Sequence, residues 1–326
     1  LDGDLDAGFE GLNVWDYRMV VDGEEPDAIS AWGREMLRNY RPDHISTPDS
    51  RWRYVAAVRT EVRYGSQCNQ YDKPELQFFQ NILMNGGVCG RRAFFGRFIL
   101  RAFGVPTTAR PQPGHAALTH WTPEGWVVCL GGGWGIGTTK LRYKKDLDFL
   151  ATTQGRANRE AYMQVKRAQW VGTVKGETPV YGFLSGGDPS LWYGVSLYRQ
   201  RAIIEADKAV ALAAVGEELG EANESKVKYA IDSATVTAAD RKISVSKDGV
   251  ITLPAVSCSK PTKSTGKIIF MPSNLGGKQL HYSRTSGSEA FEYTFDVPKA
   301  GAYALTARVV TPSWKQVLSV TANGAA

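Results

Sequence analysis

The fold is decided by residues 85–104, NGGVCGRRAFFGRFILRAFG, in which a glycine loop delivers one cysteine to an apolar run. The apolar residues recur at helical spacing and predict a largely enclosed helix that begins at Cys89. Its expected buried positions are Phe94, Phe98, Ile99, Ala102 and Phe103. A thiol in the first turn of a helix faces unpaired backbone N–H groups and the positive end of the helix dipole. Both favour the thiolate, which is the form that attacks carbonyl carbons.

Strands are predicted after this helix. The β-rich runs 107–110, 115–121 and 126–130 are separated by turns that contain proline and glycine. A helix followed by antiparallel strands indicates an α+β domain. His115 opens the second of these strands, so the sequence places a nucleophile at a helix start and a base on a strand.

His120 is an alternative base. It lies five residues after His115 and therefore points to the opposite face of the same strand, so only one of the two can face Cys89. We assign His115 as the base and interpret His120 as a surface residue or a hydrogen-bonded core residue.

The stretch from Cys89 to Trp126 resembles a known family. The segments Gly87-Val88-Cys89-Gly90, LRAFGVPTTAR at 100–110, Gly114-His115-Ala116 and Gly125-Trp126 are similar to the transglutaminase-like core over about residues 75 to 135. The resemblance implies a papain-like Cys, His and Asp arrangement, used for peptide hydrolysis or for transfer of an acyl group to an amine. Cys89 and His115 match its first two members, and no metal or cofactor is implied.

The third member of that arrangement has no match. In the family an acidic residue follows the tryptophan of the next strand, but here Trp126 leads through VVCL into the glycine run 131–133. A hairpin with its turn at 123–125 also brings only glycine opposite His115. Either a backbone carbonyl from the glycine run, or Asp146 or Asp148 folding back, can hold the imidazole. The sequence does not choose between them.

An oxyanion hole needs the N–H of Cys89 and a second donor. Gln80 and Asn85, just upstream, are the candidates for that oxyanion or orienting role.

The composition describes an ordinary globular protein, with 43% hydrophobic and 22% charged residues. A net charge of +6 favours anionic partners such as acidic polysaccharides. The sequence contains no basic run interleaved with aromatic residues, so nucleic acid binding is not predicted. No apolar stretch reaches transmembrane length. Cys68, Cys89, Cys129 and Cys258 form no CxxC pair, so no metal site is predicted. Cys68 and Cys129 are either buried thiols or a disulfide.

Three segments are expected along the chain. They are a transglutaminase-like domain at 1–205, a helical connector at 206–232 and a β-sandwich at 233–326. The best early helix of the chain is expected at 32–40, and further helices are expected at 158–170 and 189–207. The chain begins without methionine and ends where such a sandwich usually has strands to come, so we expect a piece of a longer protein.

The last ninety residues resemble carbohydrate-binding or galactose-binding-like sandwiches. The resemblance rests on FEYTFD at 291–296, a Pro-x-x-Gly-x-Tyr turn at 298–303 and ALTARVV at 304–310. Aromatic faces stack on sugars, so His281, Tyr282 and Trp314 are the glycan-binding candidates.

We therefore expect a thiol enzyme that acts on amide bonds of a peptide or cell-wall substrate, in an extracellular or periplasmic setting. The alternative is a catalytically silent transglutaminase-like scaffold or glycan-binding protein. A third hypothesis is polysaccharide cleavage in the same cleft. The arginines that would neutralise uronates are Arg91, Arg92, Arg97, Arg101 and Arg110.

Overall fold

The computed structural model describes most of the chain, namely residues 3–134, 146–182, 190–206, 212–215, 233–282, 289–311 and 317–324. Of residues 66–68 and 212–215 it describes the backbone alone. The chain divides into two compact units, the first made of residues 1–34 and 47–228 and the second of 35–46 and 229–326. Helices account for 40% and strands for 14%, so the predicted mixture of helix and sheet is confirmed.

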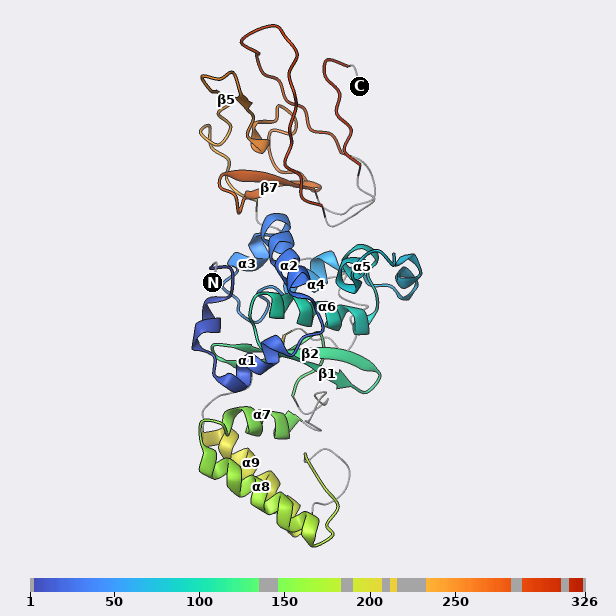
Figure 1. Ribbon diagram of the computed structural model, residues 1–326, viewed down its shortest axis with the longest axis vertical. Helices are drawn as coiled ribbons and strands as arrows, with labels where there is room; N and C mark the ends of the chain where they lie inside the picture. Colours follow the sequence, from blue (N-terminus) through green and yellow to red (C-terminus); the bar gives the residue numbers. More distant parts are fainter. Residues whose placement is uncertain are drawn as a thin grey trace. The chain divides into compact units, whose positions relative to one another are not determined.

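A layer of helices precedes the sheet in the first unit (Figure 1). Short 3-10 turns occupy Ala7–Gly11 and Ser66–Tyr71. The helices are α1 (Val14–Val21), α2 (Asp27–Tyr40, which enters the second unit at Glu35), α4 (Ala56–Glu61), α5 (Phe78–Asn85) and α6 (Cys89–Ala102). The helices predicted at 32–40 and from Cys89 onward are therefore confirmed.

The sheet has the strand order β1-β2-β3-β4. Its antiparallel part consists of β1 (Thr107–Gln112), β2 (His115–Thr122) and β3 (Gly125–Cys129), as predicted. In the β1–β2 ladder Gln112 lies opposite His115, and in the β2–β3 ladder Leu118 lies opposite Cys129.

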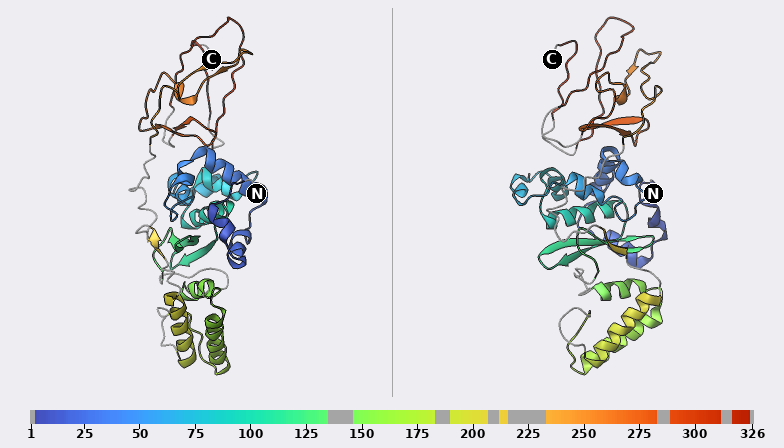
Figure 2. Two further views of the ribbon diagram at one scale, coloured as in Figure 1. Left: turned by 90° about the vertical axis from the view of Figure 1, so that its left-hand side faces the viewer. Right: turned by 180° about the vertical axis from the view of Figure 1, so that it is seen from behind.

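The fourth strand corrects the predicted helical connector. Residues Leu212–Val215 form β4, which pairs parallel to β3 and lies beside it in the left view of Figure 2. An apolar run of four residues here completes the open edge of β3, whose backbone groups would otherwise lack partners. The rest of that connector, residues 207–211 and 216–232, lies outside the described part of the chain.

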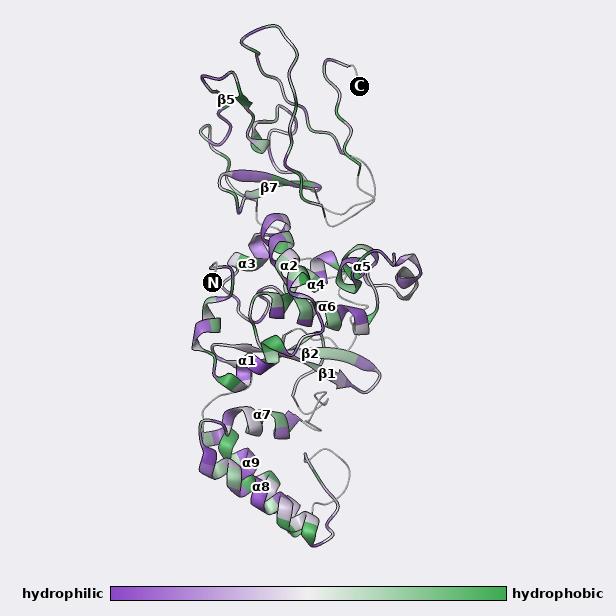
Figure 3. Cartoon of the chain, viewed as in Figure 1, coloured by the Kyte–Doolittle hydropathy of each residue, from purple (hydrophilic) through white to green (hydrophobic). Residues whose placement is uncertain are grey.

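Helix α6 packs directly on β2. A Cβ added to Gly96 would lie 2.5 Å from Leu118 Cδ2, so this position of the helix tolerates no side chain at the present distance. The buried face of α6 contains Phe95 rather than the predicted Phe94, which is only partly buried. Phe94 instead packs toward α5, where Phe79 stacks on Phe94 and Phe98 at ring-centroid distances of 5.1 and 4.1 Å. In Figure 3 green hydrophobic and purple hydrophilic stretches alternate along α6.

The other face of the sheet carries an apolar cluster of Met19, Trp126, Phe149 and Leu150. Phe149 belongs to α7 (Asp146–Gln154), which is followed by α8 (Arg159–Val174) and α9 (Leu191–Ala206). The helices predicted at 158–170 and 189–207 are thus confirmed with shifted ends. Strand alternation puts Leu118 and His120 on the α6 face and Trp126 on the α7 face.

The second unit has little regular structure in its described residues. It contains α3 (Asp43–Ser46), the hairpin β5–β6 (Ser244–Val245, Ile251–Thr252), the 3-10 turn Ala255–Ser257 and the hairpin β7–β8 (Ile268–Pro272, Lys278–Tyr282). A small core of Val256, Cys258, Ile268 and Phe270 holds it together. Residues 291–296 and 304–310 form no named strand in the described part, although they alternate as strands do, so the β-sandwich stays a prediction.

Within the described residues, no helix combines the length and the apolar character needed to cross a membrane.

The close contact at Gly96 predicts that replacing this glycine by alanine destabilises the protein, the opposite of the usual effect in a helix. Glycine to alanine in a helix normally stabilises by up to about 1 kcal/mol, but Gly96→Ala should destabilise by about 1–2 kcal/mol because it overpacks Leu118. Gly90→Ala, in the same helix with open space around it, is the matched control. Free energies of unfolding from chemical denaturation measure both, and equal stabilisation by the two changes would contradict the packing.

Candidate active site

A tight glycine turn brings the chain to Cys89. Gly86 ends α5 in the left-handed region, with φ 73° and its N–H bonded to the Ile82 carbonyl at 2.7 Å. A Cβ on Gly86 would lie 2.0 Å from the Arg63 carbonyl oxygen, which leaves room for glycine alone. Gly87 N–H then donates to that same oxygen at 2.9 Å. The turn is therefore fixed by backbone contacts to the segment at Arg63.

The N-terminus of α6 is open. Its first helical hydrogen bond runs from Arg92 N–H to the Val88 carbonyl at 3.1 Å, and Val88 provides no side-chain cap. The N–H groups of Cys89, Gly90 and Arg91 have no acceptor among the described residues. The Cys89 thiol is free and partly exposed. Three unpaired donors beside a thiol can stabilise negative charge on sulfur or on an attacked carbonyl oxygen.

An ion pair braces this turn. Arg91 binds Asp72 through two hydrogen bonds of 2.8 and 3.0 Å. Asn85 donates its amide N–H to Asp72 as well, at 3.0 Å. Gln80 uses its amide oxygen to cap α5 by accepting the Gln77 N–H at 2.9 Å. The structure thus gives both predicted oxyanion or orienting candidates a local role in shaping the turn.

A backbone carbonyl holds the predicted base. The Leu130 carbonyl oxygen lies 2.6 Å from His115 Nε2. Because a carbonyl only accepts, Nε2 carries the proton and Nδ1 keeps its lone pair. Leu130 itself has φ 59°, a left-handed conformation that costs a non-glycine residue about 1–2 kcal/mol. Of the alternatives left open by the sequence, the structure gives a backbone carbonyl, from the residue before the glycine run.

The two acidic alternatives have other partners. Asp146 forms a buried ion pair with Arg110, with Nη2 and Oδ2 2.6 Å apart. Asp148 accepts a hydrogen bond from Gln200 at 2.9 Å. Burial raises the pKa of the Asp148 carboxyl. Neither carboxylate contacts His115 in the described structure, so the imidazole has no acidic orienting partner there.

Cys89 and His115 lie at the same end of the helix–strand pair. Gly96 sits over Leu118, and Leu100 lines a small pocket with His120, so α6 and β2 run in the same direction. Seven helical residues before Gly96 and three strand residues before Leu118 each span about 10 Å. The two side chains are nevertheless not joined by a hydrogen bond, since alternation puts His115 on the face opposite Leu118. The structure aligns the pair without bringing it into contact.

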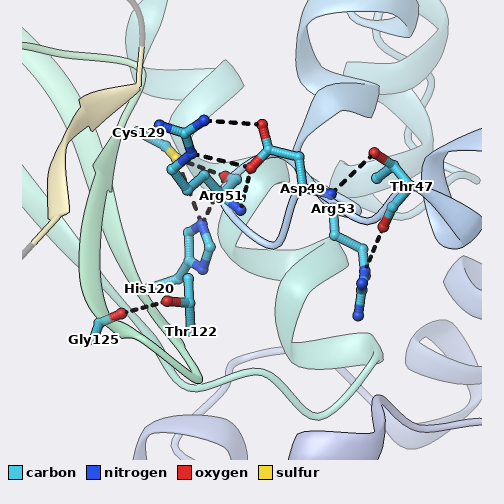
Figure 4. Close-up of polar contacts among 8 residues, drawn as sticks. All are labelled: Thr47, Asp49, Arg51, Arg53, His120, Thr122, Gly125 and Cys129. Atoms are coloured by element: carbon cyan, nitrogen blue, oxygen red, sulfur yellow. Dashed lines mark hydrogen bonds and ion pairs between the residues drawn. The ribbon is translucent and has the colours of Figure 1, made fainter.

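A second thiol and imidazole do meet (Figure 4). His120 Nε2 lies 3.5 Å from Cys129 Sγ and 3.1 Å from the Arg51 carbonyl, while Nδ1 lies 3.0 Å from the Trp121 carbonyl. His120 is 1% exposed and Cys129 is 0% exposed, so no substrate reaches them in this state. The core interpretation of His120 is therefore the one that the structure supports.

The pairing of His120 with Cys129 was not predicted, although the register of the β2–β3 hairpin indicates it. A turn at 123–125 puts His120 opposite Val127, and Cys129 then lies diagonally on the same face. The thiol form of Cys129 is also the predicted alternative to a disulfide. The Cys68 side chain lies outside the described structure.

The glycan candidates occupy different environments. His281 is buried, with its ring 5.0 Å from the Tyr40 ring, and Tyr282 packs against the small core around Phe270. Trp314 lies outside the described residues. Glycan binding by these residues stays a prediction. No group of three or more potential metal ligands occurs in the part of the chain that the structure describes.

Comparison with protein-family models, with curated proteins and with solved structures finds no match to this chain.

The buried His120 predicts a pH dependence of stability. Burial lowers the pKa of His120 below its ordinary value. As the pH falls below about 6.5, the His120 imidazole binds a proton in the unfolded chain but not in the folded chain. The free energy of unfolding therefore falls by at most about 1.4 kcal/mol per pH unit. Above that pH the imidazole is neutral in the unfolded chain too, and the free energy of unfolding no longer changes with pH through His120. His120→Gln should flatten this slope, as measured by denaturation between about pH 5 and 8; an unchanged slope would contradict the assignment.

Proposed function

We propose that the chain is a thiol enzyme of the transglutaminase-like class that acts on amide bonds. Cys89 sulfur attacks the amide carbonyl and forms a thioester, while the thiol proton passes through His115 to the departing amine. Water or a second amine then attacks the thioester, which releases the acid or the new amide and restores the thiol.

The observation that carries this proposal is the start of α6. The thiol is free and partly exposed, and it stands in the first turn of α6, where the N–H groups of Cys89, Gly90 and Arg91 are unpaired among the described residues. Such groups act on the sulfur before attack and on the carbonyl oxygen during attack. A cysteine that only fills space is expected to be enclosed, as Cys129 is.

The role of His115 follows from its tautomer. With Nε2–H donated to Leu130, Nδ1 is the atom that accepts the thiol proton. In the structure His115 lies on the face of β2 opposite α6, so the proposal requires its imidazole to turn around the start of the strand toward Cys89 when substrate binds.

The substrate class proposed is a peptide or a cell-wall crosslink. In that proposal residues 233–326 form a carbohydrate-binding-like sandwich that holds the enzyme on a glycan-rich surface, which implies an extracellular or periplasmic setting. The basic balance of the chain, with 39 lysines and arginines against 33 acidic residues, is compatible with such anionic surroundings.

A catalytically silent scaffold is the second candidate. Two observations favour it: no hydrogen bond joins Cys89 to His115, and a neutral carbonyl stands where a carboxylate is expected. A carbonyl orients an imidazole but adds no charge to stabilise the imidazolium. Replacing the orienting aspartate of a serine protease by asparagine costs about 10⁴ in rate.

Alkylation of Cys89 by iodoacetamide separates the two candidates. If Cys89 is a nucleophile, it should react at about pH 7 at least tenfold faster than in the denatured chain, because its helix start stabilises the thiolate. His115→Ala should slow that reaction severalfold. Mass spectrometry of the digested protein reports each cysteine, and the enclosed Cys129 is the internal control.

A Cys89 that is inert in the folded protein, or that reacts no faster than in the denatured chain, would support the scaffold and remove the nucleophile assignment.

A further inference from the structure

Two side chains of β1 hold the loop that carries the Leu130 carbonyl. Gln112 Nε2–H donates to the Gly132 carbonyl at 2.9 Å, and its Oε1 accepts the Gly132 N–H at 3.2 Å. Arg110 donates to the Gly132 carbonyl at 3.0 Å and to the Gly133 carbonyl at 2.7 Å. The backbone just after Leu130 is thus fixed by side chains rather than by strand pairing.

Gln112 is placed to act on His115. The two residues lie directly opposite each other in the β1–β2 ladder and therefore share a face of the sheet. A Cβ on Gly131 would lie 2.6 Å from Ala117 Cβ and 2.7 Å from Gln112 Oε1, so the loop is seated on that same face. Gln112 is hydrogen-bonded to Gly132, and two residues before Gly132 the Leu130 carbonyl is hydrogen-bonded to the His115 ring.

The two hydrogen bonds between Gln112 and Gly132 fix which residue of the loop after β3 lies against Gln112. Gln112 is 7% exposed, and a buried amide without partners is costly, so it favours the one loop position that satisfies both its atoms. Because donor and acceptor engage the same residue, a slip by one residue breaks both bonds. The left-handed Leu130 is unfavourable on its own and requires such support.

We propose that Gln112 is the positioning residue for His115. By fixing Gly132 it presents the Leu130 carbonyl to Nε2, selects the Nε2–H tautomer and leaves Nδ1 free to accept a proton. A glutamine acting through the backbone here does the orienting work of the missing carboxylate. The catalytic part of this inference rests on the proposed function, whereas the effect on the tautomer does not.

The test replaces Gln112 by leucine, which removes both hydrogen bonds at similar volume. Side-chain ¹⁵N NMR of His115 at about pH 8, where an ordinary imidazole is neutral, should change from the Nε2–H tautomer to a mixture. The rate of Cys89 alkylation should fall about tenfold, the lower end of the losses seen when a hydrogen-bond partner of a metal-binding histidine is removed. If Gln112→Leu does not fold, Gln112→Met, with an unbranched side chain, is measured instead.

Thr107→Val is the matched control. It removes a buried hydrogen bond of 2.9 Å, from the Thr107 hydroxyl to the Thr119 carbonyl, at the other end of the same strand pair. It should leave the His115 tautomer unchanged. A retained Nε2–H tautomer in Gln112→Leu, or an equal change in Thr107→Val, overturns the positioning role. A tautomer change in Gln112→Leu alone upholds it, even where Cys89 proves inert and the proposed enzyme function fails.

Discussion

The close approach of α6 to β2 is the constraint on which the candidate site depends. With no side chain at Gly96, the helix lies directly on Leu118, and the phenylalanines of its buried face fill the space on both sides. This contact fixes where α6 begins relative to the start of β2. Cys89 and His115 therefore reach the same end of the layer without any direct bond between them. Shifting the helix by one turn would move Cys89 by about 5 Å.

Backbone groups supply most of the chemistry around these two residues. Helix α6 begins at Cys89 with unpaired N–H groups, and a backbone carbonyl holds the His115 imidazole. Several contacts hold the turns that carry these groups. Gly86 packs against the Arg63 carbonyl. Gly132 is bound by Gln112 and Arg110. Such neutral groups orient a side chain but add little charge, so in the proposed enzyme proton transfer would rely on approach geometry more than on electrostatics.

Local features of this fold could be predicted from the sequence, and tertiary ones could not. The helix start at Cys89 and the three antiparallel strands follow from glycine, proline and apolar spacing within a few residues. Strand β4 depends on a distant open edge, and the stacking of Phe94 on Phe79 depends on how α5 packs against α6. The Leu130 carbonyl left no signature, because any residue provides a carbonyl. The bidentate role of Gln112 needs the loop position that only the structure gives.

If the proposed function is correct, the folded protein makes the Cys89 sulfur a selective nucleophile toward acyl groups. Brief exposure to p-nitrophenyl acetate at neutral pH, followed by peptide mapping, tests it most directly. Acetylation is expected at Cys89 alone in the folded protein, with a clear loss of that selectivity after denaturation and no labelling at this position in Cys89→Ser. Acetyl groups spread evenly over the thiols, or a folded protein that stays unlabelled, would contradict it.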